Sequence, residues 1–293
     1  MKITILDSIV YELLLSLSLY KRQTHLNYLT ISKDWYTTTK EKISLDLHNQ
    51  IVELENLQFE DLSVHLIEQC PYKDIKGYCL WLSELSTGDL YELLAPYLSE
   101  KRVLPSNLEH RRQTHISLLS KWNEEYFKGI EGNVAPILAS SILKVSQTDF
   151  TKDAYDEVEK LTKGFSIKEL NVTEVVLVPT WHFRPLSLID LFNHKIILTF
   201  PCPLSINEET LLITKALGEE KRLQILSNTR TEAKSFTDLV KILNMSKGNI
   251  HHHLLILRSA GLLEIIPTRE DYFLYKYRSD RIDDLSALLL QYE

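Results

Sequence analysis

The sequence predicts a mainly α-helical protein with small β elements (an α+β fold), in which a helical N-terminal domain precedes a smaller C-terminal domain. Most of residues 1–170 carry apolar side chains at helical spacing, interrupted by prolines and glycines. Runs of β-branched residues follow near residues 172–201, and a hairpin pattern lies close to the C-terminus. A composition of 44% hydrophobic and 25% charged residues is that of an ordinary globular protein.

The N-terminal domain is expected to begin with a short strand at residues 2–6 and a helix capped by Asp7 or Ser8. Further helices are expected near residues 33–54, 58–69, 78–85, 88–98, 107–127, 136–146 and 153–162. Strands are expected at residues 172–179 and 195–200. Because Pro201, Pro203 and Ser205 then mark a boundary, we expect one domain over residues 1–205 and a second over residues 206–293.

The C-terminal domain shows two helices, a tight turn between them and a hairpin. The first helix follows Ser235, and residues 244–246 are too few for anything but a turn. Ser246 is expected to cap the second helix, which ends at Gly261. The expected buried face of this second helix consists of Ile250, His253, Leu254 and Leu257. Residues 262–266 and 272–277 read as strands around a polar tip, and this order is that of a winged helix-turn-helix.

If that face is buried, the polar residues at the start of the second helix point outward. The expected DNA-binding residues are Ser246, Lys247, Gly248, Asn249, His251 and His252, together with Arg269 at the hairpin tip. These helix positions enter the major groove in helix-turn-helix proteins, where Lys and Asn can bond to base edges. Arg269 could reach a phosphate or the minor groove. The alternative is a solvated polar helix face, and we favour DNA.

Residues 211–263 resemble the winged-helix domain of ArsR-type transcriptional regulators. Residues 216–226 (ALGEEKRLQIL) are similar to that family's opening helix, and residues 245–262 (MSKGNIHHHLLILRSAGL) resemble its recognition segment. Residues 8–17 and 178–181 resemble an extended N-terminal domain of some large ArsR-like regulators. The resemblance implies a homodimer in which the last helix, from Asp280 to Tyr292, packs with the helix at residues 208–217.

The family's metal chemistry is not expected here. Metal-sensing members place cysteine pairs in the helix before the turn, where this chain has residues 238–241 (DLVK), and others use a histidine of the last helix, which this chain lacks. His251, His252 and His253 are consecutive, and neighbouring helix residues point about 100° apart, so the three side chains cannot converge on one ion. We therefore expect no metal and no other cofactor.

Other residue groups are candidate sites. Trp181, His182 and Arg184 could line a small-molecule pocket with the remaining tryptophans (Trp35, Trp81 and Trp122), or the tryptophans could fill the helical core, which we favour. Adjacent carboxylates such as Glu124 and Glu125 diverge on a helix and read as surface. Phosphate-binding and hydrolase motifs are absent from the sequence, and no catalytic residue is assigned. The protein is not expected to be an enzyme.

Charge and cysteine content are compatible with a DNA-binding protein of the cytoplasm. The net charge is −7, but residues 1–205 hold 21 Lys and Arg against 27 Asp and Glu, whereas residues 230–278 hold 8 against 5. Three widely separated cysteines form no metal or redox spacing, which favours a reducing compartment. No signal peptide or membrane-spanning segment is expected.

The sequence thus predicts a sequence-specific regulator of transcription, expected to be a repressor, that binds double-stranded operator DNA as a homodimer. The alternative is an interaction or assembly protein whose winged helix no longer binds DNA. A small-molecule effector stays an open expectation for residues 1–205. The operator, the effector and the domain that supplies the dimer interface do not follow from the sequence.

Overall fold

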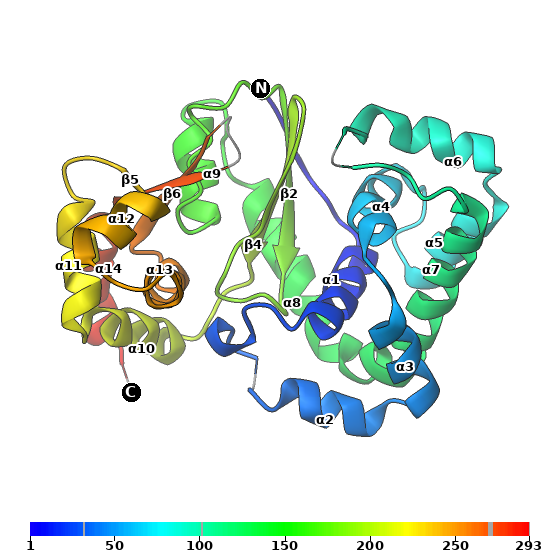
Figure 1. The fold of residues 1–293 in the computed structure, drawn as a ribbon, viewed down its shortest axis with the longest axis horizontal. Coiled ribbons are helices and arrows are strands. Elements are labelled where there is room, and N and C mark those ends of the chain that lie inside the picture. Colours follow the sequence, from blue (N-terminus) through cyan, green and yellow to red (C-terminus); the bar gives the residue numbers. More distant parts are fainter. Residues whose placement is uncertain (32, 101, 269–271, 293) are drawn as a thin grey trace.

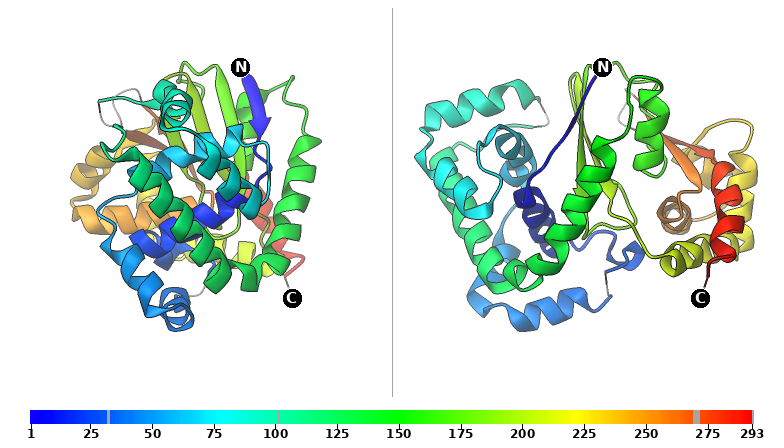
Figure 2. Two further views of the ribbon diagram at one scale, coloured as in Figure 1. Left: turned by 90° about the vertical axis from the view of Figure 1, so that its right-hand side faces the viewer. Right: turned by 180° about the vertical axis from the view of Figure 1, so that it is seen from behind.

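The computed structural model describes residues 1–31, 33–100, 102–268 and 272–292, and one β-sheet stands between its two halves (Figure 1). Most of the N-terminal helices lie on one side of the sheet, whereas α9 and the C-terminal winged helix lie on the other (Figure 2). The fold is mainly helical with small sheets, as predicted. Among the described residues, no helix is both long and apolar enough to cross a membrane.

Helices make up most of the first 170 residues. They are α1 (Ile9–Arg22), α2 (Trp35–Lys42), α3 (Leu45–Glu53), α4 (Gln58–Gln69), α5 (Ile75–Glu84), α6 (Thr87–Leu94), α7 (Leu108–Trp122), α8 (Lys128–Ser146) and α9 (Ala154–Leu161). Short 3-10 helices η1 (Leu26–Tyr28) and η2 (Ala95–Tyr97) and a π-helical turn η3 (Asn123–Phe127) complete this part. Helix α1 is buried along most of its length and forms the centre of the first core. Ser8 caps it by accepting a hydrogen bond from the backbone N–H of Val10 at 3.3 Å.

Two helix predictions for this part differ from the structure. The single helix expected near residues 33–54 is two helices, because the hydroxyl of Ser44 caps α3 by accepting from the N–H of Leu47 at 3.2 Å. The helix expected to begin at Pro136 begins at Lys128, directly after η3, and Pro136 lies inside it. Proline is favoured in the first turn of a helix, but a long helix also accommodates it at the cost of one hydrogen bond.

The central sheet has the strand order β1-β2-β4-β3. Its strands are β1 (Lys2–Ile5), β2 (Glu174–Thr180), β3 (Ile189–Phe192) and β4 (Lys195–Pro201). Strands β1, β2 and β4 run parallel, and β3 pairs antiparallel with β4. The short strand β3 was not predicted, because its four residues show no clear alternation.

Both faces of this sheet are buried, which accounts for the continuous apolar runs in its sequence. Side chains of a strand alternate between faces. Val176, Val178 and Ile197 pack into the first core with α1. Val175, Leu177, Ile196, Leu198 and Phe200 pack into a second core with the winged helix.

The C-terminal part forms the predicted winged helix. Its helices are α10 (Ile206–Leu217), α11 (Glu220–Asn228), α12 (Phe236–Leu243), α13 (Lys247–Ser259) and α14 (Asp280–Leu289). Its strands are β5 (Lys234–Ser235), β6 (Leu263–Pro267) and β7 (Phe273–Tyr277), in the order β5-β7-β6. Residue pairing of β6 with β7, such as Ile265 opposite Tyr275, gives the hairpin expected from the sequence.

A segment just before the central sheet fixes the wing in place. The N–H of Ile265 donates to the carbonyl of Gly164 at 2.7 Å, and the N–H of Ser166 donates to the carbonyl of Ile265 at 3.0 Å. A Cβ at Gly164 would lie 2.2 Å from the carbonyl oxygen of Leu263, and its φ of +120° is one that other residues avoid. Glycine is therefore required here. An ion pair between Arg278 and Glu159 at 3.2 Å adds to the attachment.

A buried polar network ties α1 to the loop after β2. The carboxylate of Glu12, which is 1% exposed, accepts from the N–H of His182 at 2.8 Å and from the ring of the same histidine. The other ring nitrogen lies 2.8 Å from the hydroxyl of Tyr126, to which Trp35 donates at 2.7 Å. His182, Trp35 and Trp122 are therefore part of the core, as the favoured alternative expected.

Replacing Glu12 with alanine is expected to destabilise the fold by roughly 3–5 kcal/mol, because it removes one partner of a buried pair and leaves two backbone N–H groups without an acceptor. Urea denaturation followed by circular dichroism measures the change. Glu41→Ala, at an exposed position of α2, is the matched control and is expected to change the stability by less than about 0.5 kcal/mol. Equal stability of the two variants would show that the network contributes little.

Candidate nucleic-acid interface

The turn between α12 and α13 is built by local side-chain bonds. Ser235 and Asp238 form a capping box at the start of α12, in which each side chain bonds to the other residue's backbone N–H. Asn244 ends the helix with a left-handed backbone, φ 48°. The hydroxyl of Ser246 then accepts from the N–H of Asn249 at 3.2 Å and caps α13. The tight turn predicted at residues 244–246 is confirmed.

The buried face of α13 is the one expected. Ile250, His253, Leu254 and Leu257 are each at most 5% exposed. His253 lies 3.7 Å from a carboxylate oxygen of Glu219, and burial lowers the pKa of the imidazole. This histidine is a packed residue rather than a surface one, in agreement with the interpretation made from its spacing.

Four of the residues predicted to contact DNA lie open at the start of α13. Ser246, Lys247, Gly248 and Asn249 are all exposed. A Cβ at Gly248 would meet nothing within 4 Å. Within the part of the chain that the structure describes, the side chains of Lys247 and Asn249 form no hydrogen bond or ion pair. They are free to bind an external partner.

The next two residues of the predicted set contact the N-terminal half instead. A nitrogen of His252 lies 2.8 Å from the hydroxyl of Tyr28 in η1. The ring of His251 stacks on His25, with 6.5 Å between the ring centroids. Burial, with the charges of Arg258 and His251, lowers the pKa of His25. The outward face of α13 is thus partly covered by the segment after α1.

The covered side of α13 also includes residues that the sequence did not single out. His251, Leu255 and Arg258 follow one another at i, i+4 and i+7 and therefore share one side of the helix. Leu255 is only 2% exposed, although it lies outside the predicted buried face. Because the covering segment lies more than 200 residues away in the chain, no local pattern marks this side.

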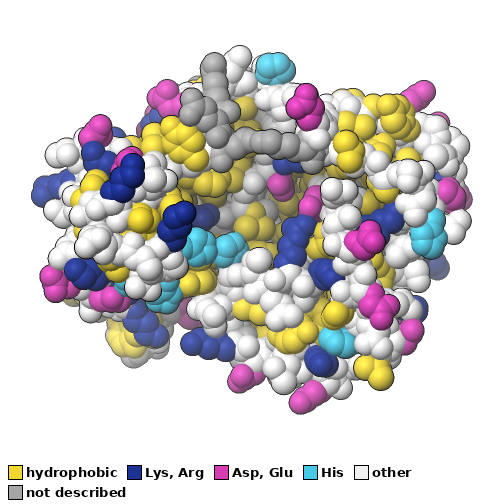
Figure 3. All heavy atoms as spheres, in the orientation of Figure 1, with side chains coloured by type: hydrophobic (Ala, Val, Ile, Leu, Met, Phe, Trp, Pro, Cys, Tyr) yellow, Lys and Arg dark blue, Asp and Glu magenta, His cyan; other side chains and the backbone are white. Residues whose placement is uncertain are grey.

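Lys and Arg side chains surround the winged helix on the face seen in Figure 3, and histidines line the edge of the hollow beside it. Exposed cations of this part include Arg230, Lys241, Lys247 and Lys276. The remaining predicted contact, Arg269, lies outside the described residues. The strands that lead to it are held together at Thr268, whose N–H donates to the carbonyl of Tyr272 at 2.9 Å.

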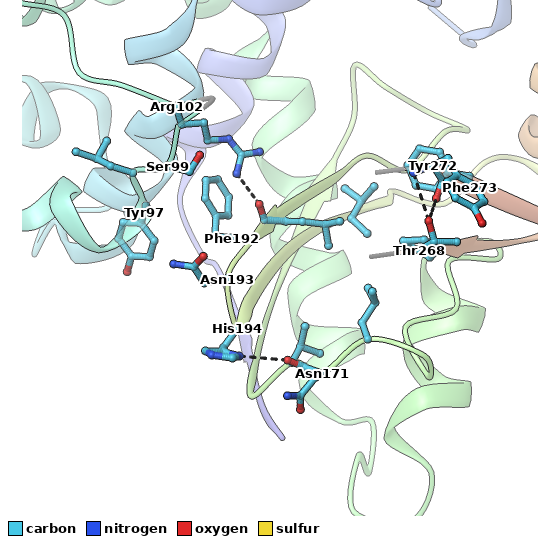
Figure 4. A pocket seen from close by; sticks show the side chains of 16 residues that line it. Tyr97, Ser99, Arg102, Asn171, Phe192, Asn193, His194, Thr268, Tyr272 and Phe273 are labelled. Carbon is cyan, nitrogen blue, oxygen red and sulfur yellow. Dashed lines mark hydrogen bonds between the residues drawn. The ribbon is translucent and has the colours of Figure 1, made fainter. Parts of the chain in front are cut away.

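Two cavities lie between the winged helix and the N-terminal half. The larger, of about 820 Å³, is drawn in Figure 4. Arg102 and Phe192 lie on one of its sides and Thr268, Tyr272 and Phe273 on the other. The guanidinium of Arg102 donates to the carbonyl of Leu191 and lies 4.1 Å from the centre of the Phe192 ring. The smaller cavity, of about 420 Å³, shares Ile189 and Phe273 with the larger one and reaches α13.

Metal ligands do not gather in the described ranges: no three His, Cys, Asp or Glu side chains are placed there to hold an ion. His251 and His252 are engaged with His25 and Tyr28, and His253 points into the core. The divergence of the three consecutive histidines is as expected from helical geometry.

Comparisons with known proteins concern the C-terminal part. No curated protein matches the chain. Among solved structures, the chain is similar to an ArsR-like transcriptional regulator from Rhodococcus sp. RHA1, with 22% identity over 30% of this chain and 82% of that one, at a TM-score of 0.27. Residues 219–264 match the model of the family described as bacterial regulatory protein, arsR family. These residues run from the N-terminus of α11 into β6, so the chain carries an arsR-type helix-turn-helix.

Proposed function

We propose that this protein is a sequence-specific transcriptional regulator, expected to be a repressor, that binds double-stranded operator DNA. The division of labour we propose assigns DNA binding to residues 206–293 and sensing or dimerisation to residues 1–205. The observation that carries the proposal is the open, polar start of α13 inside an arsR-type segment. This end of the second helix is the part that meets base edges in helix-turn-helix proteins.

The proposed DNA contacts are those at the start of α13 and on the wing. Lys247 and Asn249 would bond to base edges, and Gly248 would let the backbone approach the duplex. Ser246, His251 and His252 would lie beside the backbone of the DNA, and Arg269 would reach a phosphate or the minor groove.

A second candidate function is that of an interaction or assembly protein whose winged helix no longer binds DNA. The observation in its favour is that His251 and His252 already contact a protein segment. The open end of α13 argues against it, since a protein-binding surface would expose apolar or aromatic residues there. Retention on a heparin column that falls steeply as the salt concentration rises would favour DNA binding, because phosphate contacts release counterions.

DNA binding along this side of α13 would compete with its contacts to the segment around η1. His251 and His252 are exposed, but the ring of His251 stacks on His25 and His252 bonds to Tyr28. The wing is attached separately, through Gly164 and β6, so η1 can leave without detaching the wing. The N-terminal half therefore competes with DNA for one side of the recognition helix.

A homodimer is the proposed state of assembly. Helices α10 and α14 pack together, and apolar side chains remain exposed on and next to them. These are Ile206 and Leu211 on α10, with Leu289, Leu290 and Tyr292 at the end of the chain. A surface of this kind is suited to a second copy, and pairing two half-sites one turn of DNA apart, about 34 Å, multiplies specificity.

The first prediction concerns base contacts. Lys247→Ala and Asn249→Ala are each expected to weaken binding to a selected genomic fragment by roughly 1–3 kcal/mol, because each loses a hydrogen bond to a base edge. Fluorescence anisotropy over a salt series measures this. Lys76→Ala, an exposed lysine of α5, is the control and should leave the affinity unchanged. Unchanged affinity in both α13 variants, with folding intact, would contradict this assignment of α13.

The second prediction concerns the competition at η1. Tyr28→Phe removes the hydrogen bond to His252, whose net value is about 0.5–1.5 kcal/mol, so DNA affinity should rise by roughly 2- to 10-fold. Tyr91→Phe, at a tyrosine that is 55% exposed, is the control. The same anisotropy titration serves both. Weaker DNA binding by the Tyr28 variant would mean that Tyr28 supports binding rather than opposing it.

The third prediction concerns the dimer. The full-length chain is expected to sediment as a dimer at micromolar concentration, and Leu290→Asp, at a residue that is 87% exposed, to shift it to monomer. Leu143→Asp, at an exposed leucine of α8 (62%), is the matched control. If Leu143→Asp dissociates the dimer and Leu290→Asp does not, the dimer interface lies in the N-terminal half instead. A monomeric parent protein would refute the dimer.

A further inference from the structure

The smaller of the two interdomain cavities is built like a small-molecule site. Its volume of about 420 Å³ is at the lower end of the range for ligand pockets. Apolar and aromatic side chains dominate its walls, among them Leu14, Leu15, Phe165, Phe183, Leu188 and Phe273. Both halves of the protein contribute, since Arg258 comes from α13 and Phe273 from the wing. A small ligand that is mostly apolar fits such a cavity.

Arg258 supplies an unpaired cation to this cavity. Its Nε is buried and has no hydrogen-bond partner, and no ion pair joins its guanidinium to another described residue. The group lies over the Phe165 ring, 5.5 Å from its centre. Burial lowers the pKa of Arg258, yet arginine keeps its charge in proteins. Arg258 is half-buried and its guanidinium has no counterion among the described residues, and a carboxylate that accepts two parallel hydrogen bonds is the group that matches it best.

Three carboxylates, those of Glu60, Asp61 and Asp190, also line the cavity. Arg22 donates to both oxygens of Asp61, at 2.8 and 2.7 Å, and Glu60 lies 3.6 Å from Arg111. Asp190 has a weaker partner, Arg102 at 3.9 Å. Partial desolvation, with the nearby charge of Asp61, raises the pKa of Asp190, whose side chain is still 46% exposed. A second anionic group on a ligand would be repelled here, so the ligand carries its charge at one end.

We propose that this cavity binds a small monocarboxylate with an apolar body, with the carboxylate on Arg258. The site is connected to the recognition helix in two ways: Arg258 belongs to α13, and His25, which also lines the cavity, stacks on His251. A carboxylate bound to Arg258 neutralises the positive charge that faces His25. The stacking contact between His25 and His251 of α13 changes as a result. This regulatory consequence rests on the proposed DNA-binding function, whereas the binding site itself does not.

The test uses the full-length protein without DNA and isothermal titration calorimetry. The probes are 3-phenylpropanoate and octanoate, each paired with its neutral amide of nearly the same shape. At least one carboxylate is expected to bind, with its amide at least tenfold weaker. Arg258→Gln should lose that binding at least tenfold, while Arg230→Gln, at an exposed arginine of the winged helix, retains it. Absence of binding by both carboxylates, equal binding of the amides, or full binding by Arg258→Gln would overturn the proposal.

A second variant tests the proposal even if Arg258→Gln does not fold. Asp190→Asn removes a negative charge from the lining of the cavity and is expected to tighten carboxylate binding several-fold at pH 7, where Asp190 is ionised. Unchanged or weaker binding would contradict the proposed orientation. A separate DNA titration distinguishes the two proposals: carboxylate binding without any DNA binding refutes the regulator alone, and DNA binding without carboxylate binding refutes the cavity site alone.

Discussion

Burial of β2 and β4 on both faces is the constraint on which the rest of the structure depends. Neighbouring residues such as Val175 and Val176 belong to different cores, so each strand needs a packed layer on either side. Helix α1 and its neighbours supply one layer, and the winged helix supplies the other. The winged helix is therefore a structural layer of the protein rather than an appendage on a linker, and this brings α13 against η1.

Local signals explain which parts of the molecule could be predicted from the sequence. The α12–turn–α13 unit follows from helical spacing, the capping residues Ser235 and Ser246, and Asn244, all of which act within a few residues. The hairpin β6–β7 follows from alternation and a polar tip. The same reasoning misread Pro136 and merged α2 with α3, since a proline or a serine can both begin a helix and lie within one.

Long-range contacts explain what could not be predicted. His252 and Tyr28 contact each other although they are 224 residues apart in the chain. The helical spacing of the sequence around Arg258 does not indicate which charged side chains surround it in the folded protein. Leu255 is 2% exposed although it lies outside the buried face expected from helical spacing. The hydrogen bond between His252 and Tyr28 is worth about 1 kcal/mol, so a modest change in free energy is enough to break it.

The close approach of Gly164 to Leu263 has a consequence for engineering. Any attempt to graft this winged helix onto another protein must carry the backbone around residues 164–166, because Ile265 of β6 donates one hydrogen bond to it and accepts another from it. Val158, Phe165 and Ile167 also fill the second core, so a fragment cut at residue 206 would expose the surface they cover. Because β1 of the central sheet is Lys2–Ile5 and the other face of the sheet packs on the N-terminal helices, the winged helix cannot be separated from the rest of the chain without exposing a core.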